Sequence, residues 1–265
     1  MLQKNGIFDL TGKVALITGG GRGLGRVYCA ALAEYGADIA IADIEEKGAY
    51  ETAEIVKSLG RKALAIKADV TNPEDAQQVV FETVKELGTI DILINNAGIS
   101  LKAAKIADMP VEDWDRVIAV NLRGVFLCTR AVLPIMVKQK KGNIINIASV
   151  RGISPSFEAV VMSPKAHYAA SKGAVISFTK EAALEYAREG IRVNCIAPGH
   201  HGKGPGSRWR DAEQTRRIEE EIARITPLGR IGDPTELKGL VVYLASDASS
   251  FVTGQVFISD GGRCI

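Results

Sequence analysis

The hydrophobic positions of this chain gather in short, nearly continuous runs, separated by longer segments with helical apolar spacing. An unbroken short run is typical of a strand that is covered on both faces. The sequence predicts strands at Val14–Thr18, Asp38–Asp43, Ala63–Lys67, Ile90–Ile94, Asn143–Ala148, Ile191–Ala197 and Gln255–Ser259. It predicts helices over 23–35, 45–59, 73–87, 113–139, 168–188 and 234–245. Such alternation, joined by right-handed crossovers, predicts an α/β fold: a doubly wound parallel sheet with helices on both faces.

Capping residues mark the ends of several predicted helices. Asn72 and Asp233 each precede a proline, which is the usual order of cap and first helical residue. Glycines follow four other predicted helix ends, at Gly36, Gly60, Gly88 and Gly190. No repeat or linker interrupts the pattern, so residues 1–265 are predicted to form one domain. The alternation fails only at about 200–223, where we expect an irregular insertion that serves as a substrate loop.

Composition excludes several classes of protein. The 265 residues are 46% hydrophobic and 24% charged, which is ordinary for a globular chain, and the net charge of +2 gives no electrostatic case for nucleic acid or an anionic membrane. We find no signal peptide and no apolar run near the ~20 residues of a membrane span, so we expect a cytoplasmic protein. The four cysteines are Cys29, Cys128, Cys195 and Cys264. They are widely separated and have no histidine at ligand spacing, so no metal site is predicted.

Tyr168 and Lys172 are the first candidates for chemistry. A separation of four residues is about one helical turn, so the two side chains share a helix face. An ammonium group beside a phenol favours the phenolate, and we expect it to lower the pKa of Tyr168 from its ordinary value of about 10. Tyr168 would then exchange a proton with an alcohol oxygen as a general acid or base.

A glycine-rich segment from Thr18 to Gly25 joins the first predicted strand to the first predicted helix. Its backbone can approach a pyrophosphate, which the free N–H groups and positive dipole of the helix start would bind. Asp43 ends the second strand, where a carboxylate hydrogen-bonds ribose hydroxyls and repels a 2′-phosphate, which favours NAD over NADP. Arg22 argues for NADP, since a guanidinium in this loop would meet a 2′-phosphate.

Further motifs follow in order: Asp69-Val70, Asn95-Asn96-Ala97-Gly98, Asn121, Ser149 and Pro198-Gly199. Together with the glycine-rich segment and the Tyr168–Lys172 pair, they resemble the short-chain dehydrogenase/reductase family over nearly the whole chain. The resemblance implies a single Rossmann-type domain with about seven parallel strands. It also implies a homotetramer that interconverts a secondary alcohol and a ketone by hydride transfer. The apolar face of segment 113–139 would either pair with a second copy or be covered within its own subunit.

The resemblance assigns cofactor contacts residue by residue. The expected cofactor-binding residues are Gly19, Gly21, Arg22, Gly23, Leu24, Gly25, Asp43, Ile44, Asp69, Val70, Asn96, Ala97, Gly98, Tyr168, Lys172, Pro198, Gly199 and His201. Among them, Asp69 and Val70 would flank the adenine, and the backbone of His201 would meet the nicotinamide. Asn95 is expected to brace neighbouring strands.

The catalytic set that the resemblance implies is Asn121, Ser149, Tyr168 and Lys172. Ser149 would hydrogen-bond the substrate oxygen while Tyr168 exchanges its proton. Lys172 would hold the nicotinamide ribose and stabilise the Tyr168 phenolate. Asn121 would hold a water that connects Lys172 to solvent.

Two departures from the family pattern fall on the expected substrate side. The stretch between Ser149 and Tyr168 is longer than usual, with its extra length within 156–165. Lys203 stands where many relatives have a threonine that holds the nicotinamide carboxamide, so main-chain groups of 200–206 are left to make that contact.

Cations gather in both unusual segments: Arg151 and Lys165 in one, and His200, His201, Lys203, Arg208 and Arg210 in the other. If they converge above Ser149 and Tyr168, they suit a carboxylate, sulfonate or phosphate; otherwise they form a solvated loop. We take Arg151, His200, Lys203 and Arg208 as candidate substrate ligands. Residues 227–239 look similar to gluconate-dehydrogenase-like members, which favours a sugar, polyol or sugar-acid substrate.

Two alternative functions stay open from the sequence. A 3-oxoacyl-thioester (acyl carrier) reductase that uses NADPH would fit Arg22, although Asp43 argues against it. A catalytically silent NAD-binding protein would use the same fold, since a fold alone does not establish activity. The intact catalytic set argues against a protein without catalytic activity. No basic–aromatic stripe indicates nucleic-acid binding.

Overall fold

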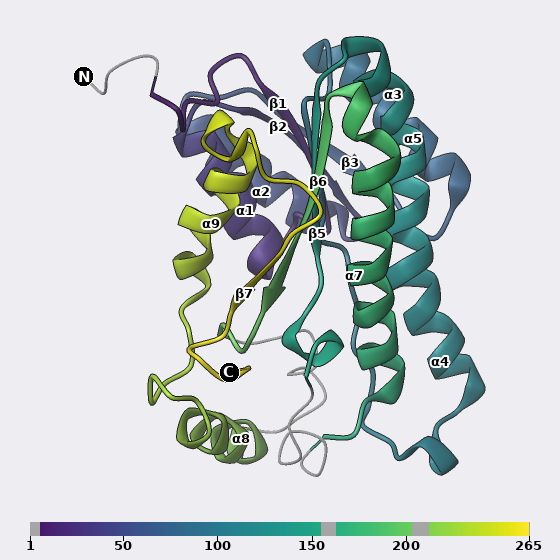
Figure 1. Ribbon diagram of the computed structural model, residues 1–265, viewed down its shortest axis with the longest axis vertical. Helices are drawn as coiled ribbons and strands as arrows, with labels where there is room; N and C mark the ends of the chain where they lie inside the picture. Colours follow the sequence, from purple (N-terminus) through teal and green to yellow (C-terminus); the bar gives the residue numbers. More distant parts are fainter. Residues whose placement is uncertain (1–5, 155–162, 203–211, 265) are drawn as a thin grey trace.

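The computed structural model describes residues 6–154, 163–202 and 212–264, and its strands form one parallel sheet between two layers of helices (Figure 1). The strands are β1 Val14–Thr18, β2 Asp38–Asp43, β3 Ala63–Lys67, β4 Ile92–Asn95, β5 Gly142–Ile147, β6 Ile191–Pro198 and β7 Val256–Ser259. They lie in the order β3-β2-β1-β4-β5-β6-β7, and every neighbouring pair is parallel. This arrangement confirms the predicted doubly wound α/β fold.

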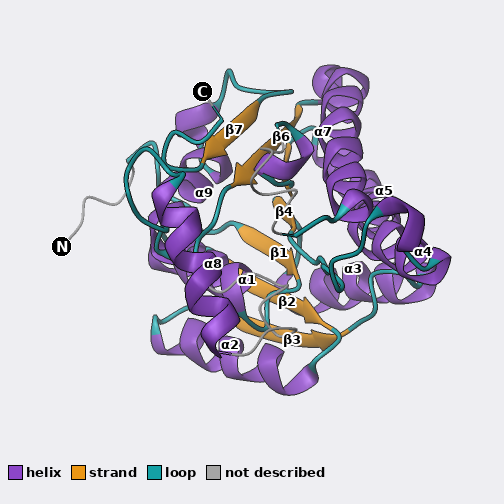
Figure 2. Ribbon diagram, turned by 90° about the horizontal axis from the view of Figure 1, so that it is seen from below, coloured by secondary structure: helices purple, strands orange, loops and turns teal. Residues whose placement is uncertain are grey.

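Helices cover both faces of the sheet (Figure 2). The described α-helices are α1 Gly23–Glu34, α2 Glu46–Ser58, α3 Pro73–Leu87, α4 Val111–Ile118, α5 Gly124–Gln139, α7 Ala166–Tyr186, α8 Ala212–Arg224 and α9 Lys238–Ala245. Alternate residues of each strand point to opposite faces. Ile17 of β1 therefore packs in the core with α1, α2 and α9, while Leu16 packs in the core with α3, α5 and α7.

The predicted helix caps are present at both proline-led starts. Asn72 accepts a hydrogen bond from Glu74 N at 2.8 Å, and Gly88 ends α3 with φ of 93°. Asp233 accepts from Thr235 N at 2.8 Å, while its own N–H donates to Glu236 at 2.7 Å. The segment after Asp233 begins as a 3₁₀ turn, η6 Pro234–Leu237, and continues as α9, so the predicted helix over 234–245 has two parts.

The predicted helix over 113–139 is interrupted by a π-helical turn, η2 Ala119–Arg123. Most of its predicted apolar face is buried within the subunit: Val117, Val125, Leu127, Val132 and Leu133 are each at most 8% exposed. By length and composition alone, the 29-residue segment Val111–Gln139 could cross a membrane, because an 18-residue window within it has a mean hydropathy of 1.5. This differs from the sequence expectation that no apolar run is near the length of a membrane span. Because the core helix of a soluble protein passes the same test, the finding is weak evidence for a membrane span.

The expectation of an irregular insertion over 200–223 is wrong for its second half. Residues 212–224 form helix α8, which lies at the end of the molecule where β6 and β7 end (Figure 1). Its sequence is mostly charged, and the apolar spacing of Ile218 and Ile222 marks the inner face. Ile222 is 4% exposed, so this face packs on the domain.

A buried row of polar side chains crosses the sheet near its carboxyl edge. Asn95 of β4 and Asn146 of β5 are in register, and Asn95 Nδ2 donates to Asn146 Oδ1 at 2.8 Å. Asn95 Nδ2 also donates to Thr129 of α5 at 2.9 Å, and Asn146 Nδ2 donates to Thr179 of α7 at 2.9 Å. This confirms that Asn95 braces neighbouring strands, and it extends the bracing to two helices.

Asn146→Ala is expected to destabilise the fold by about 1–3 kcal/mol, because it leaves the buried Asn95 amide and Thr179 hydroxyl without this partner. Urea unfolding at fixed protein concentration measures the change. Asn72→Ala is the comparison, because removing an exposed cap costs about 1 kcal/mol and leaves no buried group unsatisfied. A loss for Asn146→Ala no larger than that for Asn72→Ala would contradict a structural role for the polar row.

Candidate active site

The glycine-rich segment forms a tight turn between β1 and α1. A Cβ atom on Gly25 would lie 2.1 Å from the Gly19 carbonyl oxygen, so the first turn of α1 lies directly on this loop. The Asn96 side chain holds the loop from the end of β4, with Nδ2 donating to the carbonyls of Thr18 at 3.0 Å and Gly19 at 2.9 Å. The Thr18 hydroxyl accepts from the N–H groups of Asn96 and Ala97, both at 3.1 Å. The two loops are thus fixed to each other.

The start of α1 has the features of an anion site. Arg22 is the exposed N-cap residue and provides no side-chain hydrogen bond to the helix, and no acidic residue lies in the first turn. A Cβ atom on Gly23 would meet nothing within 4 Å. The positive end of the helix therefore has no carboxylate in its own first turn and faces open space at Gly23, which fits a cofactor pyrophosphate. Leu24 is half-buried behind it.

Asp43 lies where β2 ends, beside this turn. Its Oδ2 accepts from Gly21 N at 2.8 Å and its Oδ1 accepts from Glu45 N at 2.9 Å. The carboxylate is 7% exposed, whereas the neighbouring Ile44 is 59% exposed. A side chain at Gly21 would come within 2.9 Å of Asp43 Oδ2, so the glycine is required for this contact. The structure thus brings the predicted ribose carboxylate directly to the glycine loop.

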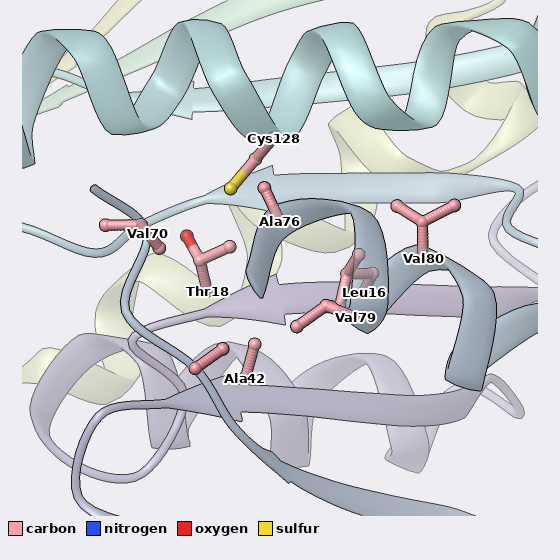
Figure 3. Close-up of a pocket in the computed structure, with 9 residues that line it drawn as sticks. Leu16, Thr18, Ala42, Val70, Ala76, Val79, Val80 and Cys128 are labelled. Atoms are coloured by element: carbon pink, nitrogen blue, oxygen red, sulfur yellow. The ribbon is translucent and has the colours of Figure 1, made fainter. Parts of the chain in front are cut away.

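Asp69 and Val70 follow β3, on the side expected for adenine. Asp69 Oδ1 accepts from the amide and hydroxyl of Thr71 at 2.9 and 2.8 Å. Val70 lines a small apolar cavity of about 10 Å³, with Thr18, Ala42 and Cys128 among its other walls (Figure 3). That volume is at the lower limit for one water molecule, so this cavity is a packing defect and no ligand site.

Helix α7 brings Tyr168 and Lys172 to the ends of β4 and β5. Lys172 Nζ lies 5.8 Å from the Tyr168 ring centroid and donates to the Ile147 carbonyl at 2.6 Å. A Cβ atom on Gly98 would be 3.5 Å from Lys172 Nζ and 3.4 Å from Asn121 Oδ1, so these groups surround one point. Burial lowers the pKa of Lys172 to about 8.

The expected lowering of the Tyr168 pKa by Lys172 is wrong in this structure. Burial raises the pKa of Tyr168, and the groups that oppose this rise are Ser149, through a hydrogen bond, and Arg151, through its charge. Lys172 has the geometry of the predicted pair, but its own burial weakens it as a cation. Ser149 caps the 3₁₀ turn Val150–Gly152 and accepts from Arg151 N at 3.2 Å, which ties the hydroxyl to the same turn as the guanidinium.

Asn121 lies in the π-helical turn and is fully buried. Its Oδ1 accepts from Ile99 N at 2.8 Å, and its Nδ2 donates to Ile99 O at 3.0 Å and to Ser171 Oγ at 3.1 Å. Ser171 in turn donates to the Tyr168 carbonyl at 2.8 Å. The side chain therefore connects the end of β4 to α7, and both amide hydrogens are used. Sequence reasoning missed Ser171, although its place between Tyr168 and Lys172 was a signal.

The expected nicotinamide side is the end of β6. Pro198 is the last residue of β6, and Gly199 N donates to Ser259 O at 2.8 Å. A Cβ atom on Gly199 would come within 2.8 Å of Asp260 Cα, so the loop after β6 lies against the residues after β7. His200 and His201 are half-buried in that loop.

The candidate substrate cations are only partly within the described residues. Arg151 donates to Ser163 O at 2.9 Å, and the 9% exposed Lys165 donates to Ser100 Oγ at 2.7 Å. Neither is therefore a solvated loop charge, and Ser100 is a partner that the sequence did not indicate. Lys203, Arg208 and Arg210 lie outside the described residues, as does most of the extra length at 156–165. No group of His, Cys, Asp and Glu that could hold a metal occurs in the described part.

Comparisons with known proteins agree with this geometry. A family model described as enoyl-(acyl carrier protein) reductase matches residues 19–263. The chain is 40% identical to the 3-oxoacyl-(acyl-carrier-protein) reductase FabG of Thermotoga maritima, over 97% of this chain and 99% of that one. It is 38% identical to the 5-keto-D-gluconate 5-reductase of Escherichia coli, over 98% and 99% of the two chains. A gluconate 5-dehydrogenase structure from Burkholderia cenocepacia, in complex with NADP and tartrate, matches with a TM-score of 0.88 at 38% identity over 97% of each chain.

The chain belongs to the short-chain dehydrogenase/reductase family. As a member, it is an oxidoreductase that acts on CH–OH groups and binds a nicotinamide cofactor. The glycine turn, the uncapped start of α1 and the Asp43 carboxylate fit the phosphate and ribose of such a cofactor. The Tyr168–Lys172 pair lies at the same carboxyl edge of the sheet, where open α/β folds bind their ligands.

Gly25→Ala is expected to weaken cofactor binding about tenfold or more, because the added methyl group collides with the Gly19 carbonyl and displaces the phosphate loop. Quenching of protein fluorescence by NADH measures the dissociation constant. Gly239→Ala in α9 is the control, because a Cβ atom there meets nothing within 4 Å. Equal affinity for the Gly25→Ala and Gly239→Ala variants would show that the loop does not hold the cofactor.

Proposed function

We propose that the chain is an NAD-dependent oxidoreductase that interconverts a secondary alcohol and a ketone on a sugar, polyol or sugar-acid substrate, with Tyr168 as general acid and base. The observation that carries the chemistry is that the Tyr168 phenol has the Ser149 hydroxyl close enough to lower its pKa and the Lys172 ammonium group 5.8 Å from its ring. A hydroxyl and a phenol in contact can hold one substrate oxygen between them, which is the arrangement that proton exchange requires.

In the mechanism, the bound nicotinamide supplies hydride chemistry. Ser149 hydrogen-bonds the substrate oxygen and fixes it beside the phenol. Tyr168 accepts the alcohol proton during oxidation and returns a proton to the oxygen during reduction. Lys172, held by the Ile147 carbonyl, has further N–H groups that would hold the cofactor ribose and support the phenol. Asn121 fixes the end of β4 against α7, and we retain the proposal that a water at Asn121 passes the proton from Lys172 to solvent.

The choice of NAD rests on Asp43. Its carboxylate is buried beside the glycine turn, where a 2′-phosphate would add a second negative charge next to it. Arg22 is exposed at the start of α1 and is the group that would favour NADP. We give Asp43 the greater weight because its position is fixed by two main-chain hydrogen bonds, whereas Arg22 makes no capping bond.

The proposed substrate class draws on two relatives, the 5-keto-D-gluconate 5-reductase and the gluconate 5-dehydrogenase. In this chain, the positive charge of Arg151 acts to lower the pKa of Tyr168, so one cation acts on the reacting phenol. Such a charge suits a carboxylate on the substrate. We extend this proposal to His200, Lys203 and Arg208 as further substrate contacts.

We also propose a cytoplasmic homotetramer. Helices α4, α5 and α7 expose large apolar side chains, which include Trp114 at 39%, Phe126 at 45% and Leu184 at 78% exposure. These residues, unlike the buried face predicted from the sequence, are available to pair with a second copy.

The second candidate function is an NADPH-dependent 3-oxoacyl-thioester reductase. It is favoured by the 40% identical reductase of Thermotoga maritima and by the exposed Arg22. A catalytically silent NAD-binding protein is the third, and the joined set of Ser149, Tyr168 and Lys172 argues against it.

The test measures turnover from the absorbance of the reduced cofactor at ~340 nm. The substrates are sugar acids, neutral polyols and 3-hydroxyacyl thioesters, each with NAD and with NADP. We expect the highest kcat/KM with a sugar acid and NAD. Asp43→Asn should reduce the preference for NAD over NADP about tenfold or more, because it removes the charge that repels the 2′-phosphate. Tyr168→Phe should abolish turnover and leave NADH binding intact.

Preference of the wild type for a thioester with NADP would replace the proposal with the second candidate. An unchanged NAD preference in Asp43→Asn would remove Asp43 from cofactor selection. If neither the wild type nor Tyr168→Phe shows turnover while both still bind NADH, the third candidate is favoured.

Alcohol oxidation is expected to rise with pH into the alkaline range, because burial raises the pKa of Tyr168 and oxidation requires the phenolate. Ketone reduction uses the protonated phenol and should stay flat through neutral pH. Arg151→Gln removes a positive charge that lowers this pKa, so its oxidation profile should shift to higher pH, while Arg151→Lys should shift less. The measurement is kcat as a function of pH. A lower kcat with substrate deuterated at the reacting carbon shows that hydride transfer limits the rate. Identical midpoints for the Gln and Lys variants would show that charge at position 151 does not act on Tyr168.

A further inference from the structure

The loop after β6 is joined to a second loop that lies before η6. His201 and Gly232 form a parallel bridge. Gly202 N donates to Gly232 O at 3.0 Å, and Gly232 N donates to His200 O at 2.9 Å. These main-chain bonds hold the two loops side by side, and His201 is at their centre.

The imidazole ring of His201 occupies the space that a side chain at position 232 would need. A Cβ atom on Gly232 would lie 2.6 Å from Cδ2, 2.8 Å from Nε2 and 3.2 Å from Cγ of His201. Its three nearest atoms are therefore all in this ring, and Gly232 has no positive φ that would itself exclude alanine. A larger residue at this position would therefore require the ring to move.

Polar groups surround the outer part of the ring. Nε2 lies 3.4 Å from Ser259 Oγ, and Nδ1 is enclosed with no hydrogen-bond partner among the described residues. The charged neighbours are Asp233, Glu236 and Arg230, and the last two form a bidentate pair at 2.7 and 2.8 Å. Burial lowers the pKa of His201, although the Gly199 backbone, Glu236 and Asp233 oppose this. A neutral ring on a glycine can pack closely without leaving a buried charge.

We propose that His201 is a positioning residue whose ring, packed on Gly232 and directed at Ser259, sets the place of the main chain at Pro198–Gly202. This extends the sequence expectation, which assigned only the backbone of His201 to the nicotinamide. The link to the cofactor rests on the proposed function, because it requires that this loop faces the nicotinamide. The clasp, meaning the main-chain bonds and the ring contact that join the two loops, does not depend on the proposed function.

The test is a double-mutant cycle with Gly232→Ala, His201→Ala and the double variant. Gly232→Ala should raise the NADH dissociation constant about tenfold, because the methyl group displaces the ring and the loop with it. On the His201→Ala background the same substitution should add less than about twofold, since nothing remains to collide with it. Gly239→Ala is the control for a glycine-to-alanine change with open space. His201→Gln should recover part of the affinity lost in His201→Ala, because its amide nitrogen can reach the position of Nε2.

Hydrogen exchange of the cofactor-free protein gives a readout that does not depend on cofactor binding. Faster exchange at Gly202 N and Gly232 N is expected in Gly232→Ala and His201→Ala, with the melting temperature of each variant recorded to exclude global unfolding. An equal effect of Gly232→Ala in both backgrounds, or unchanged exchange at both amides in His201→Ala, would overturn the clasp. If wild type bound no nicotinamide cofactor, the proposed function would fail, while the exchange data would still decide whether the ring holds the loop.

Discussion

The buried ammonium group of Lys172 is the constraint on which the rest of the site depends. An ammonium group that is 3% exposed needs a strong acceptor, and the Ile147 carbonyl at 2.6 Å provides one. That bond ties α7 to the end of β5, and the helix then places Tyr168 one turn earlier, within reach of Ser149. Gly98, after the end of β4, lies beside the same ammonium group. The phenol, the serine and the glycine are therefore all positioned relative to one buried charge.

Close main-chain approaches build the rest of this edge of the sheet. Gly25 lets α1 touch the loop after β1, Gly199 lets the loop after β6 touch Asp260, and Gly232 makes room for the His201 ring. In each case a side chain would collide with atoms of the neighbouring segment. The polar row through Asn95 and Asn146 holds the strands below them in register, so the loops start from fixed positions.

The parts of the structure that depend on local sequence could be predicted. Strands β1, β2 and β3 and helix α3 have the predicted limits, because apolar runs and the Asn72–Pro73 start define them within a few residues. The π-helical turn at Asn121 could not be predicted, because its sequence continues a helical pattern. Its structural role lies in the hydrogen bonds of the Asn121 side chain to Ile99 and Ser171, which the sequence does not indicate. Helix α8 was missed because its charges resemble a solvated loop, and only two isoleucines mark its inner face. The sequence also placed Tyr168 and Lys172 on one helix face, but it did not indicate the contact of the His201 ring with Gly232, a glycine 31 positions later.

The pKa of Tyr168 shows why residue spacing alone predicted a pKa shift in the wrong direction. A pair of residues one turn apart predicts attraction between ammonium and phenolate, but it says nothing about how deeply both are buried. Here burial disfavours the charged form of each partner, raising the pKa of the phenol and lowering that of Lys172 to about 8. At neutral pH the stable combination is thus a protonated lysine beside a neutral phenol. In the alkaline range, where the phenolate forms, the lowered pKa of Lys172 makes its charge a weaker support for that phenolate. A guanidinium group keeps its charge throughout that range, which makes Arg151 the cation that can still assist the phenolate.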